Sequence, residues 1–293
     1  MARSTFVAAL VGAGVSLALC SAALAQAIVV GAKEFAEQLL VAEMTTKLLQ
    51  ANGFSAHKGT GFATTGVRTL QESGIIDLYW EYTGTALRTF NQLTEKLPPD
   101  EAYARVRALD AQRGLVWLAS SKVNNTYALA MRRADAAAKG ISSISDLASK
   151  VRKGEGIRLA STAEFLTRSD GLKPLQQAYG FKLMLGNVVA MDPAAEGEFD
   201  VGVVFATDGR ISALDLTILQ DDQGFFPSYL LAPVVRQTTL ERHPTLKTVL
   251  ESLSAQLDTP TMAALNAAVD LQGRKVEEVA FEFLQVRRLL SVR

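Results

Sequence analysis

Aromatic side chains are scarce in this sequence, yet several of them lie inside polar, turn-like motifs. They make up 7% of the 293 residues. The motifs are Tyr79-Trp80-Glu81-Tyr82-Thr83-Gly84-Thr85, Asn124-Asn125-Thr126-Tyr127, Val204-Phe205-Ala206-Thr207-Asp208-Gly209 and Phe225-Phe226-Pro227-Ser228-Tyr229. A single ring in such a place fills a hydrophobic core by default. The face of an aromatic ring can also attract a cation, which is the chemistry that a group of such rings could perform.

The patterns of common catalytic and metal sites are absent. His57 and His243 are the only histidines, and Cys20 is the only cysteine, so neither a histidine-dependent triad nor a cysteine metal site is supported. No phosphate-binding P-loop, zinc-protease, nucleophile-elbow or EF-hand pattern occurs. The remaining enzymatic alternative is an exported hydrolase that uses the hydroxyl of Ser161 or Thr162, although neither lies in a recognisable nucleophile motif. We therefore expect no enzyme, no cofactor and no metal.

Composition and periodicity predict a folded α/β protein. Hydrophobic residues are 48% of the chain, enough for a sizeable core, and the 30 basic and 30 acidic residues lack the excess charge of a nucleic-acid binder. Apolar strands such as 27–30 and 200–205 alternate with helices, including one over 144–151 capped by Ser143 and Asp146. This alternation indicates mainly parallel sheets. We interpret the glycine-rich stretch 59–66 as a flexible loop.

Residues 1–25 are typical of a secretory leader. Arg3 precedes an apolar stretch from Phe6 to Leu19, and Ala23-Leu24-Ala25 matches a signal-peptidase site before Gln26. An uncleaved anchor is the alternative. Cys20 follows Leu19 where a lipid-attachment motif has a small residue. We therefore expect a soluble periplasmic protein without a lipid anchor, and the rest of the chain has no apolar run long enough for a transmembrane helix.

Five motifs resemble those of one transport family. They are Gly31-Ala32-Lys33-Glu34-Phe35-Ala36-Glu37-Gln38, Ile76-Asp77-Leu78-Tyr79-Trp80-Glu81-Tyr82-Thr83-Gly84-Thr85, Asn124-Asn125-Thr126-Tyr127-Ala128-Leu129, Phe165-Leu166-Thr167-Arg168-Ser169-Asp170-Gly171 and Phe225-Phe226-Pro227-Ser228-Tyr229. The family is that of the substrate-binding proteins of osmoprotectant ABC importers, for glycine betaine, carnitine and choline, with the type II periplasmic binding fold. The resemblance extends from about Val29 to Asp270, with the motifs in the expected order.

The resemblance implies a two-lobed protein with a ligand cleft between the lobes. The first lobe would combine residues 26–121 with 224–293, and the second would comprise residues 122–223. The protein would be a monomer that binds a quaternary-ammonium or other zwitterionic solute and delivers it to a membrane permease.

The resemblance also implies the ligand-binding residues. An aromatic box would consist of Tyr82, Tyr127, Phe205 and Tyr229, with Thr64, Thr65 and Asn125 as further polar contacts. A trimethylammonium group has no N–H to donate, so electron-rich ring faces hold it where ordinary acceptors cannot. Arg168 would bind a carboxylate tail, and its alternative role is a salt bridge to Asp170.

Three departures from the family pattern leave the ligand open. Phe205 stands where family members often have Tyr, Trp80 and Ser228 stand where they often have Pro, and residues 61–65 lack the usual Gly-Gly-Thr. A histidine-derived betaine such as ergothioneine, or a plain amino acid, therefore remains an alternative to glycine betaine. A sensor that binds the same ligand without transport is a further one.

Overall fold

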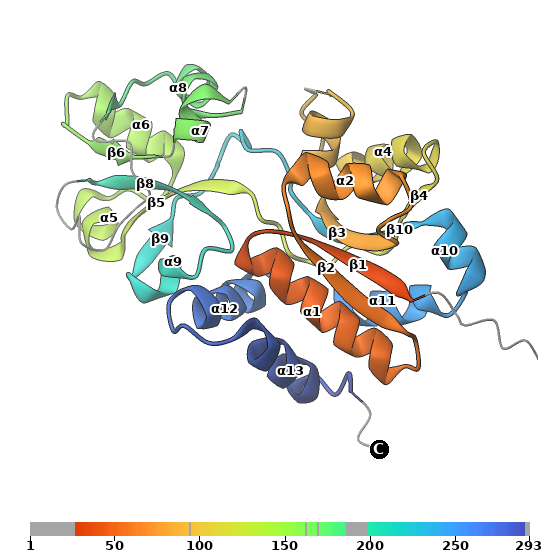
Figure 1. Cartoon of the computed structure of the whole chain (residues 1–293). Helices are drawn as coiled ribbons and strands as arrows, with labels where there is room; N and C mark the ends of the chain where they lie inside the picture. Colours follow the sequence, from red (N-terminus) through yellow and green to blue (C-terminus); the bar gives the residue numbers. More distant parts are fainter. Residues whose placement is uncertain (1–26, 94, 162, 169, 186–198, 291–293) are drawn as a thin grey trace, which may run out of the picture.

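The computed structural model describes residues 27–93, 95–161, 163–168, 170–185 and 199–290. Two five-stranded sheets organise this part of the chain, and Figure 1 shows them side by side. The predicted leader and Cys20 lie outside the described residues. Among the helices that are described, none is long and apolar enough to cross a membrane.

The first sheet has the strand order β2-β1-β3-β10-β4. Its strands are β1 (Ile28–Lys33), β2 (Ala56–Phe62), β3 (Leu78–Tyr82), β4 (Leu115–Trp117) and β10 (Leu231–Arg236). β1 is parallel to β2 and β3, whereas β10 is antiparallel to both β3 and β4. The Ile28-Val29-Val30 run suits β1 because a strand covered on both faces needs apolar residues in succession.

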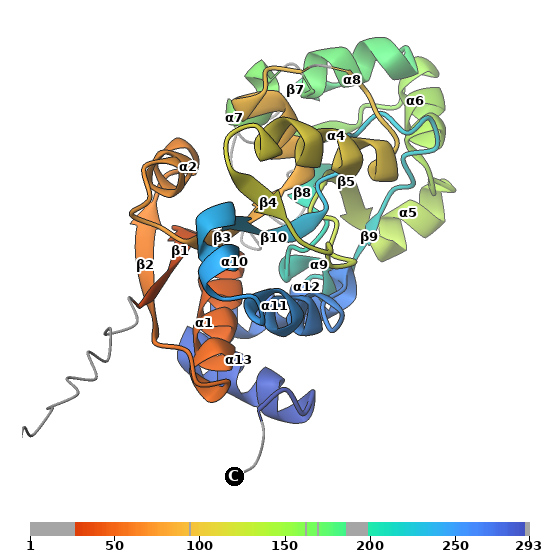
Figure 2. The same cartoon turned by 90° about the vertical axis from the view of Figure 1, so that its right-hand side faces the viewer.

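Helices cover both faces of the first sheet (Figure 2). The helices of this unit are α1 (Ala36–Ala51), α2 (Thr64–Glu72), α3 (Thr83–Thr85), the π-helix η1 (Ala86–Phe90), α4 (Pro99–Ala111), α10 (Gln237–Arg242), α11 (Leu246–Ser254), α12 (Thr259–Asp270) and α13 (Val276–Val286). Leu40, Trp80 and Phe283 belong to a core beneath α1 and the C-terminal helices. Val106, Trp117 and others form a second core, under α4.

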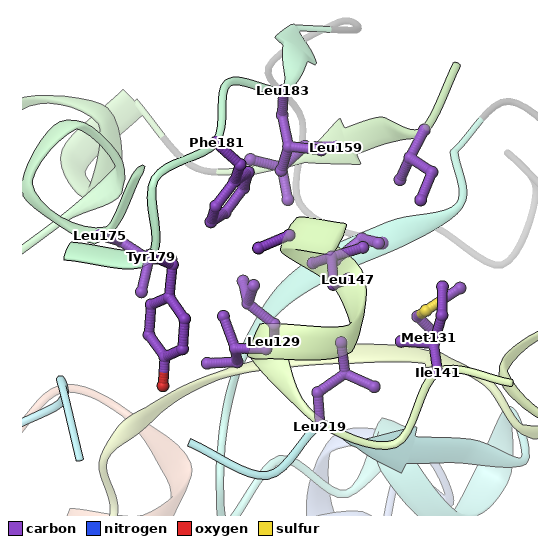
Figure 3. Close-up of a cluster of buried hydrophobic side chains, with 14 of the residues drawn as sticks. Leu129, Met131, Ile141, Leu147, Leu159, Leu175, Tyr179, Phe181, Leu183 and Leu219 are labelled. Atoms are coloured by element: carbon purple, nitrogen blue, oxygen red, sulfur yellow. The ribbon is translucent and has the colours of Figure 1, made fainter. Parts of the chain in front are cut away.

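The second sheet has the strand order β7-β6-β8-β5-β9. Its strands are β5 (Tyr127–Arg132), β6 (Arg158–Ala160), β7 (Met184–Leu185), β8 (Val201–Phe205) and β9 (Leu216–Ile218). Its helices are α5 (Arg133–Lys139), α6 (Ile144–Arg152), α7 (Ala163–Thr167), α8 (Leu172–Tyr179) and α9 (Arg210–Ala213). Figure 3 shows its core, where Leu147 of α6 lies among Leu129, Leu159 and Leu219.

Local signals explain several element ends. The predicted capping box of α6 is present: the Asp146 amide donates to the Ser143 hydroxyl, and the Asp146 carboxylate accepts from the Ser143 amide. α8 ends at Gly180, whose positive φ of 65° favours glycine. The predicted loop over 59–66 is wrong, because β2 and the start of α2 occupy it. Pairing of β2 with β1 outweighs the weak strand preference of Gly59 and Gly61.

The predicted α/β class is confirmed, but the sheets are mixed rather than mainly parallel. β5 is antiparallel to β8 and β9, while β6 is parallel to β7 and β8. The antiparallel pairs arise because β5 and β10 each enter their sheet from a segment that connects the two sheets. These segments, 118–126 and 219–230, lie side by side at an antiparallel bridge between Asn124 and Leu230. The lobe boundaries at 121/122 and 223/224 stay a prediction.

Candidate functional site

A cavity of about 570 Å³ lies between elements of the two sheets. Its volume is in the range of small-molecule sites. It is lined by Lys33, Phe35, Thr64, Tyr82, Thr85, Thr89, Asn125, Tyr127, Arg168, Phe205 and Tyr229. Seven of the eight predicted site residues are in this set. The eighth, Thr65, is exposed on α2 and is not among the lining residues. We call this space the ring cavity.

Tyr82 brings the first sheet to the ring cavity. It is the last residue of β3, and it is buried. Its hydroxyl donates to Oε1 of Glu37 at 2.6 Å and accepts from Nε2 of Gln38 at 3.2 Å. Burial, reinforced by the charge of Glu37, raises the pKa of Tyr82 well above its usual value, so the phenol stays neutral. Phe35 stacks near this ring, with 6.4 Å between ring centroids.

Tyr127 and Phe205 bring the second sheet to the same space. Tyr127 begins β5 and Phe205 ends β8, and the two residues are directly opposite in the antiparallel register. Their ring centroids are 4.5 Å apart. Phe165 supports Tyr127 from within the core, at 5.1 Å between centroids. Tyr127 is 6% exposed and Phe205 is 43% exposed, so Phe205 offers the more accessible ring.

Tyr229 lies on the segment that leads into β10. Its amide donates to Oδ1 of Asn124 at 2.7 Å, which fixes the backbone beside the other connecting segment. Its ring passes so close to Gly84 that a Cβ at that position would lie 2.6 Å from the ring. Glycine is therefore required at 84 for this packing, which accounts for the Thr83-Gly84-Thr85 sequence in the motif.

Arg168 lines the ring cavity and also makes the salt bridge to Asp170 that was its alternative role, while its contact with a carboxylate stays a prediction. It lies in the wall of the ring cavity, and it donates from Nε to Oδ1 of Asp170 at 2.7 Å and from Nη2 to Oδ2 at 3.0 Å. Nη2 also donates to the hydroxyl of Tyr229 at 2.9 Å. The guanidinium carbon lies 5.1 Å from the centre of the Tyr127 ring. The salt bridge therefore orients a cavity residue rather than removing it from the site.

Asp170 lies close to two arginines, Arg168 from the second-sheet unit and Arg88 from the first-sheet unit. It accepts from the Tyr229 hydroxyl at 3.0 Å, and Nε of Arg88 in η1 lies 3.6 Å from its Oδ2. Burial alone would raise the pKa of Asp170, but the hydrogen bonds and charge of Arg168 outweigh it and leave the pKa lowered. The same surroundings raise the pKa of Tyr229, first through burial and then through Asp170.

Sequence reasoning missed four lining residues. Phe35, Lys33, Thr85 and Thr89 were not named as contacts, although the first three lie inside motifs that carried the resemblance. Phe35 had a usable signal, since it is an aromatic residue two positions after the end of a buried strand. Lys33 is buried and donates to Oε1 of Glu81 at 2.6 Å, and its ammonium lies 5.0 Å from the centre of the Tyr82 ring. Its charge is therefore balanced inside the wall.

The enzymatic alternative finds no support in this geometry. Ser161 is 3% exposed, and Thr162 lies outside the described residues. Neither His57 nor His243 lines the ring cavity. Within the described ranges, no group of three or more His, Cys, Asp or Glu side chains could hold a metal ion.

Comparisons with known proteins agree on one family. Residues 26–286 match the model described as the substrate binding domain of ABC-type glycine betaine transport system. The chain is 39% identical to a glycine-betaine-binding protein of Pseudomonas aeruginosa, over 93% of this chain and 92% of that protein. It is 30% identical to the ergothioneine transport permease/ergothioneine binding protein EgtU of Helicobacter pylori, over 88% of this chain and 47% of that protein.

A solved structure supports the fold. Apo YehZ of Escherichia coli superposes with a TM-score of 0.78 at 31% identity, covering 90% of this chain and 100% of that one. It shares the mixed sheets flanked by helices.

Proposed function

Because the chain belongs to the family of substrate-binding domains of ABC-type glycine betaine transport systems, we propose that it binds a quaternary-ammonium solute in the ring cavity and delivers it to a membrane permease. Members of this family are binding receptors of ABC transporters and not enzymes. The proposal includes an extracytoplasmic location, in line with the leader predicted over residues 1–25. Family membership specifies neither the ligand class nor the residues that bind the ligand, and both belong to this proposal.

One observation carries the proposal: three rings from two different sheets and a fourth from a connecting segment line one cavity. Tyr82 comes from the first sheet, Tyr127 and Phe205 from the second, and Tyr229 from a connecting segment. Each ring face contributes on the order of 0.5–2 kcal/mol to binding a cation such as trimethylammonium. Several of them approach the ~8 kcal/mol that a micromolar complex requires. Because the walls belong to both sheets, bound ligand would favour the closed arrangement of the two.

The carboxylate of a betaine would bind a positively charged residue of the ring cavity. Arg168 is the cavity residue suited to this task, since its guanidinium is oriented by Asp170 and Tyr229. The hydroxyls of Thr64, Thr85 and Thr89 and the amide of Asn125 line the same space. These groups would supply further hydrogen bonds to a carboxylate or to a choline hydroxyl.

An ergothioneine-like solute is the second candidate ligand. It is favoured by the 30% identity to a protein named for ergothioneine binding. Such a compound has a trimethylammonium group and a carboxylate, so it would use the same rings and the same arginine.

Isothermal titration calorimetry of the exported chain tests the proposal. Glycine betaine, choline, carnitine, proline betaine and ergothioneine are the ligands, and we expect at least one to bind. We expect Tyr127→Ala to weaken that binding about tenfold. The matched control is Tyr103→Ala, which removes a half-buried ring from α4 away from the cavity. Equal losses for the two variants would remove the aromatic box, and silence across all five ligands would discard the osmoprotectant function.

A further inference from the structure

A second cavity adjoins the ring cavity. It has a volume of about 380 Å³ and shares Phe35, Asn125 and Phe205 with the ring cavity. The rest of its wall comes from the start of α1, the segment between β8 and α9 with the first residue of α9, and the end of α12 with the residue after it. Gly209 and Ala267 pack closely beside it, since a Cβ on Gly209 would lie 2.5 Å from the Ala267 backbone. We call this space the acceptor cavity, for the groups that line it.

Asn266 presents a buried oxygen without a donor. This side chain is 6% exposed and lines the acceptor cavity. Its amide nitrogen donates to Oε2 of Glu37 at 3.0 Å and to the carbonyl of Thr207 at 2.9 Å. Two acceptors on the nitrogen fix which way the amide faces. Oδ1 is therefore the remaining atom, and it is buried with no hydrogen-bond partner among the described residues.

Asn125 repeats the pattern in the shared wall. Its nitrogen donates to Oε1 of Glu37 at 3.1 Å, and its buried Oδ1 also lacks a partner among the described residues. A buried acceptor without a donor costs free energy. Two such oxygens near one cavity define a place where an incoming N–H or O–H group would be stabilised.

Glu37 lines the acceptor cavity, and its carboxylate accepts hydrogen bonds from two residues of the ring cavity, Tyr82 and Asn125. Its carboxylate is 2% exposed, and its three hydrogen-bond donors within the described ranges, Tyr82, Asn125 and Asn266, are neutral groups. Asp208 and Asp270 also line the acceptor cavity, and among its described lining residues Arg210, which binds Asp208, is the one basic residue. Burial and then the charge of Asp208 raise the pKa of Asp270, as expected where carboxylates crowd together.

The two cavities therefore differ in the groups they would accept. Among the described residues, the charged ones that line the ring cavity are Lys33 and Arg168, whereas those that line the acceptor cavity are mostly carboxylates. Phe205 and Leu271, 43% and 42% exposed, add apolar surface to the acceptor cavity. A flat ring that carries N–H groups matches this combination of apolar surface and acceptors.

We propose that the acceptor cavity is a second subsite for the same solute, which binds an N–H or O–H donor group at the end opposite the carboxylate. This inference rests on the proposed function and narrows its ligand class. The favoured solute is a betaine whose side chain bears hydrogen-bond donors, rather than the small glycine betaine, which has none. Its trimethylammonium group lies among the rings and its donor group contacts Asn266, Asn125 or Asp270.

Calorimetry with three ligands tests the subsite in the exported chain. Ergothioneine carries N–H groups on its ring, whereas glycine betaine and the longer γ-butyrobetaine have the same charged groups and no donor. We expect ergothioneine to bind at least about tenfold more tightly than either of the others. We expect Asn266→Leu to abolish most of that advantage while changing glycine betaine affinity less than about threefold.

Asp270→Asn provides a second variant at an exposed wall position, where folding is not at risk. We expect it to reduce the ergothioneine advantage about threefold, and Glu278→Gln, exposed on α13 away from the cavity, to leave it unchanged. If glycine betaine binds and ergothioneine has no advantage, or keeps its full advantage in both cavity variants, the subsite is wrong and the proposed function stands. If no quaternary-ammonium ligand binds, both are wrong.

Discussion

Arg68–Asp110 and Arg168–Asp170 are chemically the same ion pair in two different regions. Arg68 of α2 donates to Asp110 of α4 through Nη1 at 2.8 Å and Nη2 at 2.7 Å. Asp110 is fully buried and also accepts from Nε1 of Trp117 at 2.7 Å. All of these partners belong to elements around the first sheet. The pair therefore holds one unit together.

Arg168–Asp170 has a similar forked geometry but different surroundings. The two residues are only two positions apart, so the pair itself closes no long loop. Its neighbours supply the connection, because Arg88 lies in the first-sheet unit and Tyr229 on a connecting segment. The arginine side chain is also 26% exposed, at the cavity wall. The comparison teaches that the surroundings, and not the pair itself, distinguish an arginine buried between helices from one that lines a cavity.

Removing the charge of Asp110 is expected to have the largest effect on the stability of the two ion pairs compared. We expect Asp110→Asn to lower the free energy of unfolding by about 3 kcal/mol, because Arg68 loses its buried partner and keeps the more exposed Glu72, 2.6 Å from its Nε, as a counter-charge. Urea denaturation measures this loss, and ligand affinity of the folded protein should be unchanged. Asp100→Asn on the exposed first turn of α4 is the control, with an expected change below ~1 kcal/mol. Equal losses would mean that Asp110 is not a structural partner.

Asp170→Asn is the matched change at the cavity. We expect a smaller loss of stability than for Asp110→Asn, since Arg168 can turn toward solvent, together with a glycine betaine affinity about tenfold weaker. The reason is that Arg168 and Tyr229 both lose the acceptor that orients them. Paired denaturation and calorimetry separate the two effects. A loss confined to stability would place this pair in the same class as Arg68–Asp110.

Arg168→Lys sharpens the assignment of the carboxylate contact. An ammonium cannot reproduce the fork that reaches Asp170 and Tyr229 together. We expect about fivefold weaker binding of glycine betaine, which has a carboxylate, and less than about twofold for choline, which has none. Arg274→Lys, exposed between α12 and α13, is the control. Parallel losses for both ligands would argue that Arg168 does not contact the carboxylate.

Acid pH gives the smallest and most specific effect. The pKa of Asp170 is lowered in the folded protein, because Arg168 outweighs the opposing effect of burial. A lowered folded pKa means that the ionised group stabilises the fold above its ordinary pKa of ~4 and loses that contribution as pH falls through the folded value. The unfolding free energies of the wild type and Asp170→Asn should therefore begin to converge below about pH 4 and continue to converge as pH falls toward the lower folded pKa. A difference that stays constant from pH 7 to pH 3 would contradict this linkage.

Local sequence signals predicted the elements well where each signal acts within one element. The capping box at Ser143 and Asp146 needs only neighbouring residues, and it is present. β2 was missed because its strand character comes from its pairing with β1, while its own glycines favour a loop. The mixed sheets were missed for the same reason. The direction of β5 and β10 depends on the path of the segments that connect the two sheets, which local sequence does not specify.

The motifs identified the aromatic positions of the ring cavity. They did not identify the hydrogen bonds around Glu37 that hold Tyr82 and Asn125 in place. Glu37 binds Asn125 and Asn266, which are 88 and 229 residues away in the chain. No spacing rule connects such positions, so neither the acceptor cavity nor the role of Glu37 follows from the sequence. Arg168 shows a different limit of the sequence. The sequence left a ligand contact and a salt bridge as alternatives, and only the structure shows that the salt bridge lies in the cavity wall.

The positions of β1 and α13 have a practical consequence. Both elements pack on α1, so the described chain begins and ends on the same unit (Figure 1). Among the described residues, the internal segments 118–126 and 219–230 carry the chain from that unit to the second sheet and back. A dye, surface linker or fused reporter attached at either end would therefore be attached to the unit of the first sheet and not to the second. The protein could then be immobilised for a biosensor without attaching anything to the second sheet.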